Sequence, residues 1–486
     1  MSNSTQMASG TIWNTIERFS VIGIQLVCTF VLARYLSPSA FGLMGMLVVF
    51  TLIGNTIAES GFSQALIREG EVTHSMLSTV FWSNLLLSLV IYGLLWLSAP
   101  LIAQFYNQPE LITLSRATFL TIPIGALSLV HVVMCTRQLA FRRLCIVSLI
   151  ASLTSCIVAV LAAWLTHSVW ALALQNITVY ALRTLGLWFA TQFRPKLTFD
   201  FTALKQLFAF SRNILVTGII GNLFNNIYTL LIGRNYGASA TGFYAQADRM
   251  RQVTSASLTN VVQSVSYPIL SHIHHDKNSD MLTMRQSYRR LILVTLVVVG
   301  LTTTLLMCIS EDLMQLLMGE SAWRTSGRYF YALGVVGILF PLHAVNQNIL
   351  LVHKLGRTIL LLEVARRTLM IAIIAIALQF GIDVFVWSYA IYSFLLLFVN
   401  LYVCGRPIGY SLHDQLRDIS PILLRIIIIL FAAQCTNHLL ALQPLLFRCT
   451  VTFILSLLLV FMLFRHHPAV IDVKDIIMRM RKRIDY

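Results

Sequence analysis

The stretch Ser78–Ala103, STVFWSNLLLSLVIYGLLWLSAPLIA, is apolar over more residues than a bilayer requires. A transmembrane helix needs about 20 predominantly apolar residues to cross a hydrocarbon core of about 30 Å. The apolar run is continuous, whereas a membrane barrel strand alternates apolar and polar side chains over about ten residues. The stretch therefore predicts a membrane-spanning helix.

Comparable apolar runs recur along all 486 residues, and the polar connections between them are short. Only 11% of the residues are charged, against about 25% in an ordinary soluble domain, which excludes a water-soluble globular protein. We predict an all-α polytopic membrane protein with about fourteen transmembrane helices. The expected spans are 10–33, 41–59, 78–103, 112–135, 142–164, 168–192, 208–232, 241–270, 288–310, 328–352, 358–380, 383–403, 419–439 and 445–464.

The formal net charge of +16 is explained by where the cations fall between the spans. Cation-rich and cation-poor connections alternate, so the positive-inside rule places both termini in the cytoplasm. The charge is therefore a topology signal, and nucleic acid is not an expected partner. The cation-rich segments are 137–143, 194–212, 277–290, 354–367, 406–417 and the tail from 465.

Two stretches 200 residues apart resemble each other. VLARYLSPSAFGLMG begins at Val31 and LIGRNYGASATGFYA at Leu231, and the ungapped alignment pairs Arg34 with Arg234 and Gly42 with Gly242. A chance match is the alternative, because few positions are identical. As a repeat, the stretches are separated by six spans and have the same orientation, an arrangement typical of transporters.

The repeat predicts two pseudo-symmetric six-helix lobes followed by two additional C-terminal helices. The expected segments are an N-terminal lobe at 1–192, a cytoplasmic linker at 193–207, a C-terminal lobe at 208–403, the two additional helices at 404–464 and a basic cytoplasmic tail at 465–486.

Several motifs resemble the polysaccharide transporter family of Wzx-type oligosaccharide flippases. They include ARYLSPSAFGLMGM from Ala33, ESGFSQALIRE from Glu59 and GRNYGASATGFYAQADRM from Gly233. This family belongs to the multidrug/oligosaccharidyl-lipid/polysaccharide exporter superfamily. The resemblance runs from about residue 8 to about residue 400, and the chain departs from it at Glu59, where many relatives carry Asp.

The resemblance implies two helical bundles in the bacterial inner membrane that work by alternating access. The implied substrate is an undecaprenyl-pyrophosphate-linked oligosaccharide repeat unit for O-antigen, capsule or exopolysaccharide. The implied partners are this lipid-linked oligosaccharide, membrane lipids and, by family analogy, a polysaccharide polymerase of the same pathway.

Polar residues lie inside the expected spans, where a charge costs at least about 2.5–3.5 kcal/mol. Asn14, Arg18 and Gln25 fall within about 40° of one another on the first expected span. Asn222, Asn225 and Asn226 form a comparable row on the seventh. We expect both rows to line a hydrated cleft between the lobes, and the alternative is hydrogen bonding between neighbouring helices.

Arginine suits a pyrophosphate group because its guanidinium binds phosphate oxygens in a bidentate manner. Arg18, Arg249 and Arg251 are therefore the expected pyrophosphate ligands, while the amides would bind sugar hydroxyls. Asp248 offers an alternative partner for Arg251, three residues away on a helix.

No catalytic residue, metal ligand or cofactor is expected, because GxxxxGK[ST], HExxH and CxxC motifs are missing from the sequence. Transport then needs an energy source other than nucleotide hydrolysis, and H+ and Na+ are candidate coupling ions. Glu17, Glu59 and Asp248 are the candidate coupling carboxylates, with local salt bridges as the alternative. A cation-coupled multidrug exporter, a lipid II flippase of the same superfamily and a membrane glycosyltransferase remain competing hypotheses.

Overall fold

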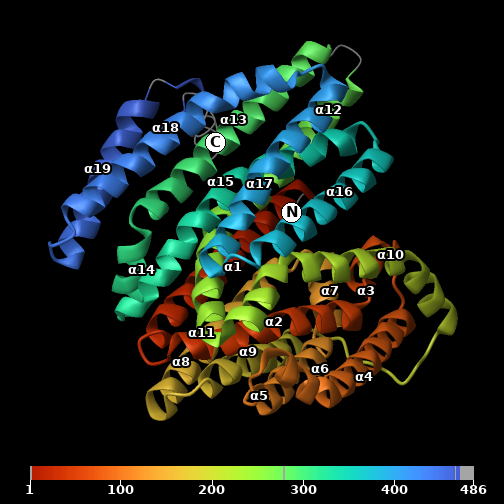
Figure 1. Ribbon diagram of the computed structural model, residues 1–486. Helices are drawn as coiled ribbons and strands as arrows, with labels where there is room; N and C mark the ends of the chain where they lie inside the picture. The colour runs from red at the N-terminus through yellow and green to blue at the C-terminus, as the bar shows by residue number, and fades with distance from the viewer. Residues whose placement is uncertain (1–2, 277–279, 466, 471–486) are drawn as a thin grey trace. The chain divides into compact units, whose positions relative to one another are not determined.

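The computed structural model describes residues 3–276, 280–465 and 467–470 (Figure 1). Within these ranges the regular structure is helical, which confirms the predicted all-α class. Most of the basic tail predicted at 465–486 lies outside the described residues. The chain forms two compact units, Met1–Ala245 and Gln246–Tyr486. The lobes expected at 1–192 and 208–403 stay a prediction.

The first unit combines long helices with a segment of short helices, and the span expected at 112–135 falls in this segment, which is still long and apolar enough to cross a membrane at Leu111–Arg137. There the chain forms three consecutive pieces, α5, α6 and α7. The helices of this unit are α1 (Asn3–Leu32), α2 (Pro38–Glu59), α3 (Phe62–Arg68), α4 (His74–Tyr106), α5 (Leu111–Thr118), α6 (Thr121–Ala126), α7 (Leu129–Arg137), α8 (Phe141–Thr166), α9 (Trp170–Ala190), α10 (Phe201–Asn225) and α11 (Ile227–Arg251), whose last residues belong to the second unit.

The second unit begins within the last turns of α11, which continue through a π-helical turn at Gln252–Ala256. Its helices are α12 (Ser257–His275), α13 (Met281–Cys308), α14 (Ser310–Met318), α15 (Arg324–Val352), α16 (Gly356–Ala377), α17 (Ile382–Gly405), α18 (Leu412–Leu439) and α19 (Leu445–Phe464), with short 3-10 turns at Ser321–Trp323 and Arg406–Ile408.

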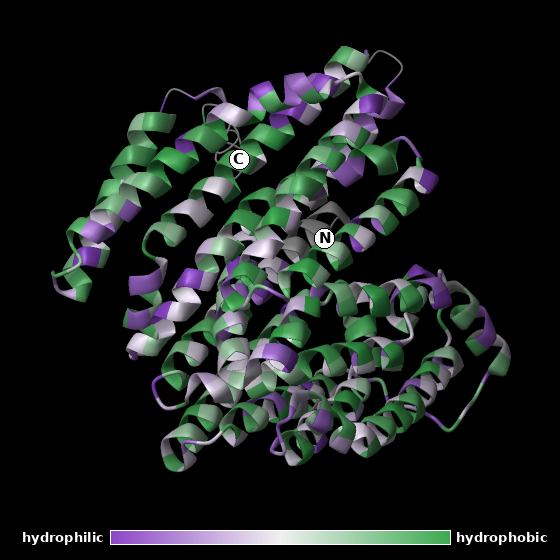
Figure 2. Ribbon diagram, in the orientation of Figure 1, coloured by the Kyte–Doolittle hydropathy of each residue, from purple (hydrophilic) through white to green (hydrophobic). Residues whose placement is uncertain are grey.

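Among the described residues, ten helical stretches are long and apolar enough to cross a membrane. A further candidate is the pair Ser211–Asn225 and Ile227–Ser255, which is bent by 42°. Figure 2 shows hydrophobic residues along most of the helical length. Helices α9 and α16 have the length of a span but carry more polar residues. The structure thus confirms a multi-pass membrane protein, while the count of fourteen and the cytoplasmic termini stay predictions.

The two copies of the sequence repeat cross each other within the first unit. A Cβ atom on Gly42 would overlap the carbonyl oxygen of Ala238, and a Cβ on Gly242 would overlap that of Pro38. These pairs are reciprocal, because 38 and 42 become 238 and 242 at the offset of 200. Each copy also changes direction at the equivalent place, at Ser37 before α2 and at Gly237, whose φ is +83°. The structure therefore supports a true repeat rather than a chance match.

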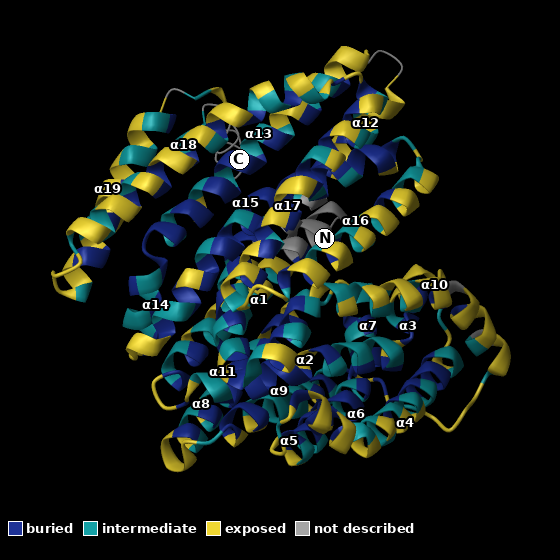
Figure 3. Ribbon diagram, in the orientation of Figure 1, coloured by how far each residue is buried: buried dark blue, intermediate teal, exposed yellow. Residues whose placement is uncertain are grey.

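Burial separates the central helices from the peripheral ones (Figure 3). In the second unit, 72% of the most apolar stretch of Ser321–Val352 is buried, against 22% for Leu445–Phe464. Helix α15 is thus the core of this unit, and α19 leaves most of its apolar surface for lipid. In the first unit, α3, α4 and α7 share a core built around Phe62, Phe81 and Val130.

Several cations that the charge count assigned to cytoplasmic connections lie inside helices with acidic partners. Arg285 of α13 contacts Asp414 of α18 at 2.8 Å, and Arg366 of α16 contacts Glu363 at 2.6 Å. Their assignment to loops was wrong, because α13 begins at Met281, before the span expected at 288–310, and Arg366 lies well inside α16 and inside the span expected at 358–380. Part of the positive charge is therefore used in ion pairs, between two helices at Arg285 and within one helix at Arg366.

Candidate functional site

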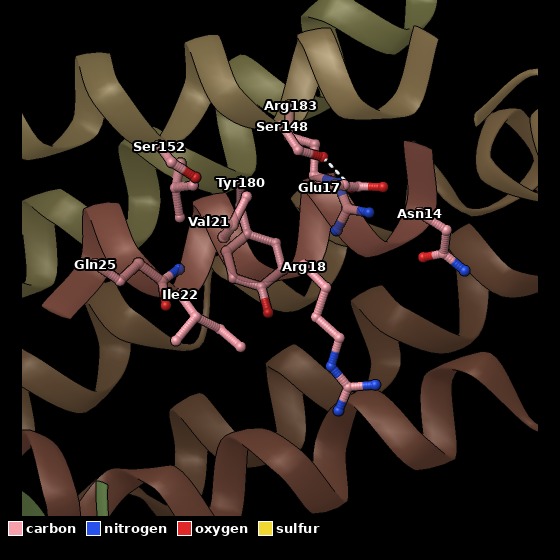
Figure 4. A pocket seen from close by; sticks show the side chains of 11 residues that line it. Asn14, Glu17, Arg18, Val21, Ile22, Gln25, Ser148, Ser152, Tyr180 and Arg183 are labelled. Atoms are coloured by element: carbon pink, nitrogen blue, oxygen red, sulfur yellow. Dashed lines mark hydrogen bonds between the residues drawn. The ribbon is translucent and has the colours of Figure 1, made fainter. Parts of the chain in front are cut away.

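A cavity of about 540 Å³ lies in the first unit between α1, α8 and α9. Figure 4 shows side chains from α1 facing side chains from the other two helices across it. We call it the α1 cavity. Its lining residues are Asn14, Glu17, Arg18, Val21, Ile22, Gln25, Ser148, Ser152, Val179, Tyr180 and Arg183.

The predicted polar row on the first span becomes one wall of this cavity. Asn14, Arg18 and Gln25 all line it, as their helical spacing indicated. Glu17 lines it as well, and its carboxylate accepts a hydrogen bond of 2.6 Å from the hydroxyl of Ser148 on α8. The Arg18 side chain is exposed and extends away from α1 in Figure 4.

The opposite wall contributes groups that the sequence analysis did not select. Tyr180 and Arg183 stand one turn apart on α9 and face the cavity. The cavity thus holds two guanidinium groups and one carboxylate, so its ionised side chains favour an anion. An arginine in an otherwise apolar helix was the available signal for Arg183, but pattern alone does not show which helix its side chain faces.

A second cavity of about 390 Å³ shares Tyr180 and Arg183 with the first. It contains Glu59, which lies within electrostatic range of Arg183. It also contains Asn84, which is fully buried and donates a hydrogen bond of 3.2 Å to the carbonyl of Ala126. Within the described residues, the Asn84 Oδ1 atom has no hydrogen-bond partner. This second cavity is therefore polar and has an acceptor available for a ligand or water.

The asparagine row predicted on the seventh span is placed differently. The Asn222 side chain donates to the Thr56 hydroxyl of α2 at 2.7 Å, and Asn226 donates to the carbonyl of Asn222 at 2.9 Å. Asn225 is exposed at the end of α10. None of the three lines either described cavity. Asn222 thus acts between helices, as in the alternative considered from the sequence.

The remaining predicted residues lie in the second unit. Asp248 forms an ion pair of 2.7 Å with the buried Arg251 and accepts a hydrogen bond of 2.7 Å from Gln252. The predicted pairing of Asp248 with Arg251 is therefore confirmed, and their charges offset each other. Arg249 lies between Asp248 and Arg251 in the last turn of α11.

Comparison with known proteins gives a family match over most of the chain. The family model described as polysaccharide biosynthesis protein matches residues 31–327, which include both copies of the repeat. The matched range covers α2 to α14 and ends near the beginning of α15.

Named relatives are similar over about 70% of the chain. The teichuronic acid biosynthesis protein TuaB of Bacillus subtilis (strain 168) is 24% identical over 71% of each chain. The lipopolysaccharide biosynthesis protein WzxC of Escherichia coli (strain K12) is 27% identical over 70% of this chain and 68% of its own. The succinoglycan biosynthesis transport protein ExoT of Rhizobium meliloti (strain 1021) is 26% identical over 69% and 66%.

Solved structures show the same fold at low sequence identity. The inward closed conformation of the lipid II flippase MurJ superposes with a TM-score of 0.69 and 14% identity, covering 96% of this chain and all of that one. An inward-facing multidrug resistance transporter of the MATE family in the MOP superfamily superposes with a TM-score of 0.63 and 13% identity, covering 81% and 98%. These likenesses show a transporter fold.

Proposed function

Because this chain belongs to the polysaccharide biosynthesis protein family, we propose that it is a flippase for a lipid-linked oligosaccharide. It moves the repeat unit of an O-antigen, capsule or exopolysaccharide across the bacterial inner membrane. The observation that carries this proposal is the α1 cavity, a polar chamber with two arginines inside an apolar helical unit. Ionisable groups at such depth normally face a hydrated pathway or one another.

The chemistry of the α1 cavity suits a pyrophosphate-linked sugar. Arg18 and Arg183 offer planar, permanently charged donors that match phosphate oxygens. Asn14 and Gln25 offer amide groups for sugar hydroxyls, while the lipid chain remains in the bilayer. Arg249 and Arg251, in the second unit, remain candidate pyrophosphate ligands from the sequence, and pairing with Asp248 makes Arg251 the weaker one.

We propose alternating access driven by H+ or Na+ as the transport cycle. Glu17, Glu59 and Asp248 remain the candidate coupling carboxylates from the sequence. Two of them, Glu17 and Glu59, line cavities in the first unit, which supports their role. The third is held by Arg251 and Gln252, which makes it the weaker candidate.

A cation-coupled multidrug exporter fits this cavity less well, because two arginines against one glutamate repel an organic cation. A lipid II flippase shares the fold and the anionic substrate chemistry. Complementation separates the two flippases, since a lipid II flippase rescues peptidoglycan export and an oligosaccharide flippase does not.

The test is charge reversal at Arg18 in cells that carry this protein as the single flippase of its pathway. We expect the R18E variant to export little polymer and to accumulate undecaprenyl-linked repeat units on the inner leaflet, which mass spectrometry identifies. The matched control is R142E, because Arg142 is an exposed arginine on α8 outside the cavity. Full export by R18E at normal protein level contradicts the role of the α1 cavity.

A further inference from the structure

A chain of hydrogen bonds links three helices inside the second unit, away from the residues used so far. The Arg366 guanidinium of α16 contacts Glu363 at 2.6 Å and donates to the Asn400 Oδ1 atom of α17 at 2.6 Å. The Asn400 Nδ2 atom lies 2.6 Å from His343 Nδ1 of α15. His343 Nε2 lies 3.4 Å from the Ser393 hydroxyl of α17. We call these five residues the His343 network.

The donors and acceptors of the network have one consistent assignment. A guanidinium can only donate, so the Asn400 oxygen faces Arg366 and its amino group faces His343. The His343 Nδ1 atom must then accept, and the imidazole is neutral with its proton on Nε2. Asn400 is fully buried, so bulk water does not replace either bond in this packing.

The charged group that acts on His343 in this arrangement would repel a positive charge on the imidazole. Arg366 is the charged side chain that acts on the imidazole through space. Tyr389 and Tyr392 belong to α17, and Tyr392 lies within electrostatic range of Glu363, Arg366 and Arg367.

Other neighbours of α15 contribute titratable groups further away. Tyr288 of α13 donates to Asn346, about one turn beyond His343. Glu311 of α14 and His274 of α12 lie near the two ends of α15, beside Arg324 and His353. The local field at His343 is therefore set mainly by α16.

We propose that His343 is a proton-binding site. Its protonation during transport breaks the hydrogen bonds that hold α15 against α16 and α17. This rests on the proposed flippase function and names H+ as the coupling ion. When the Nδ1 lone pair takes a proton, the imidazolium N–H points at the amino group of Asn400, and two donors face each other. Asn400 must then turn over, which places its amino group against Arg366 and breaks that bond. Proton binding and the packed network thus exclude each other.

Because the two exclude each other, proton binding is coupled to a conformational change. The N–H bond is the one covalent bond that forms and breaks. A ligand shifts an equilibrium toward the state that binds it better, and a histidine at a helix interface is a common form of this switch. Return of the proton to water on the other side of the membrane restores neutral His343 and the packed network.

The experiment uses the full chain in vesicles, with lipid-linked repeat units extracted from a deletion strain. We expect wild-type translocation to fall at least about fivefold as the pH rises from about 5 to about 8, because fewer His343 imidazoles then take up a proton. The H343Q variant keeps an acceptor for Asn400 but cannot titrate. It is expected to lose this pH dependence, together with the substrate-induced proton uptake seen with a pH-sensitive dye.

The matched control is H353Q, because His353 lies at the end of the same helix and bonds to the carbonyl of Ile349. It should keep the wild-type pH profile. A second variant, N400D, places a carboxylate against the imidazole and is expected to move the midpoint up by about one pH unit. This opposite shift keeps the test informative if H343Q folds poorly.

The outcomes separate the two proposals. Unchanged pH dependence and proton uptake in H343Q, or an N400D midpoint that stays in place or moves down, overturns the proton site while leaving the flippase intact. Loss of pH dependence in H353Q as well overturns it too. Wild-type protein that moves no glycan overturns both proposals.

Discussion

The α1 cavity and the His343 network place polar residues inside apolar helices in opposite ways. In the cavity, Arg18 is exposed and Glu17 accepts a hydrogen bond from the Ser148 hydroxyl. In the network, Arg366 bonds to both Glu363 and Asn400, and Asn400 bonds to His343 as well. Polar side chains in apolar helices thus either line a hydrated cavity or bind one another. Side chains that line a cavity can bind a ligand, whereas side chains that bind one another stabilise helix packing.

The largest expected effect comes from breaking the network at its cation. The R366M variant removes the donor to Asn400 Oδ1 and, among the described residues, leaves Glu363 paired with Arg367 alone, at 3.5 Å. We expect the free energy of unfolding to fall by about 3 kcal/mol, as for other partly buried charge pairs that lose one member. Titration with SDS in mixed micelles measures this change.

The control for that variant is R357M, because Arg357 is an exposed arginine near the beginning of the same helix. Its free energy of unfolding should stay within about 0.5 kcal/mol of wild type. Equal losses in the two variants would show that the network does not stabilise the packing of α16.

An intermediate effect is expected from S148A in the α1 cavity. The substitution removes the hydroxyl that donates to Glu17, but water in the cavity can donate in its place. The free energy of unfolding should therefore fall by about 0.5–1.5 kcal/mol. A loss near that of R366M would mean that Glu17 is sealed from water, which would remove the distinction between the two regions.

The sequence predicted the helical class, the repeat and the shared face of Asn14, Arg18 and Gln25, because these depend on local periodicity, while the cleft expected between the lobes stays a prediction. Asn14, Arg18 and Gln25 share a face through the helical repeat alone. Tyr180 and Arg183 could not be assigned to the opposite wall, since their partner helix lies more than 150 residues earlier in the chain. The His343 network escaped prediction for the same reason, although a Glu363–Arg366 pair within an expected span was a visible signal.

The smallest effect on the free energy of unfolding is expected from R18M, which removes a charged side chain from the α1 cavity. The Arg18 side chain is exposed, so its removal should change the free energy of unfolding by no more than about 0.5 kcal/mol. Binding of lipid-linked oligosaccharide should weaken by about tenfold, which corresponds to one charge-assisted hydrogen bond. Fluorescence titration of the purified protein measures the affinity, and an unstable R18M protein would contradict the assignment.

The reciprocal crossing of α2 and α11 limits how the two halves of the repeat can tolerate mutation. Each glycine faces a main-chain carbonyl of the other copy, Gly42 against Ala238 and Gly242 against Pro38. No smaller side chain elsewhere can make room for a methyl group at either position, because a carbonyl is common to every amino acid. A genetic screen for suppressors of G42A should therefore recover substitutions that shift a whole helix. It should not recover a smaller side chain at position 238.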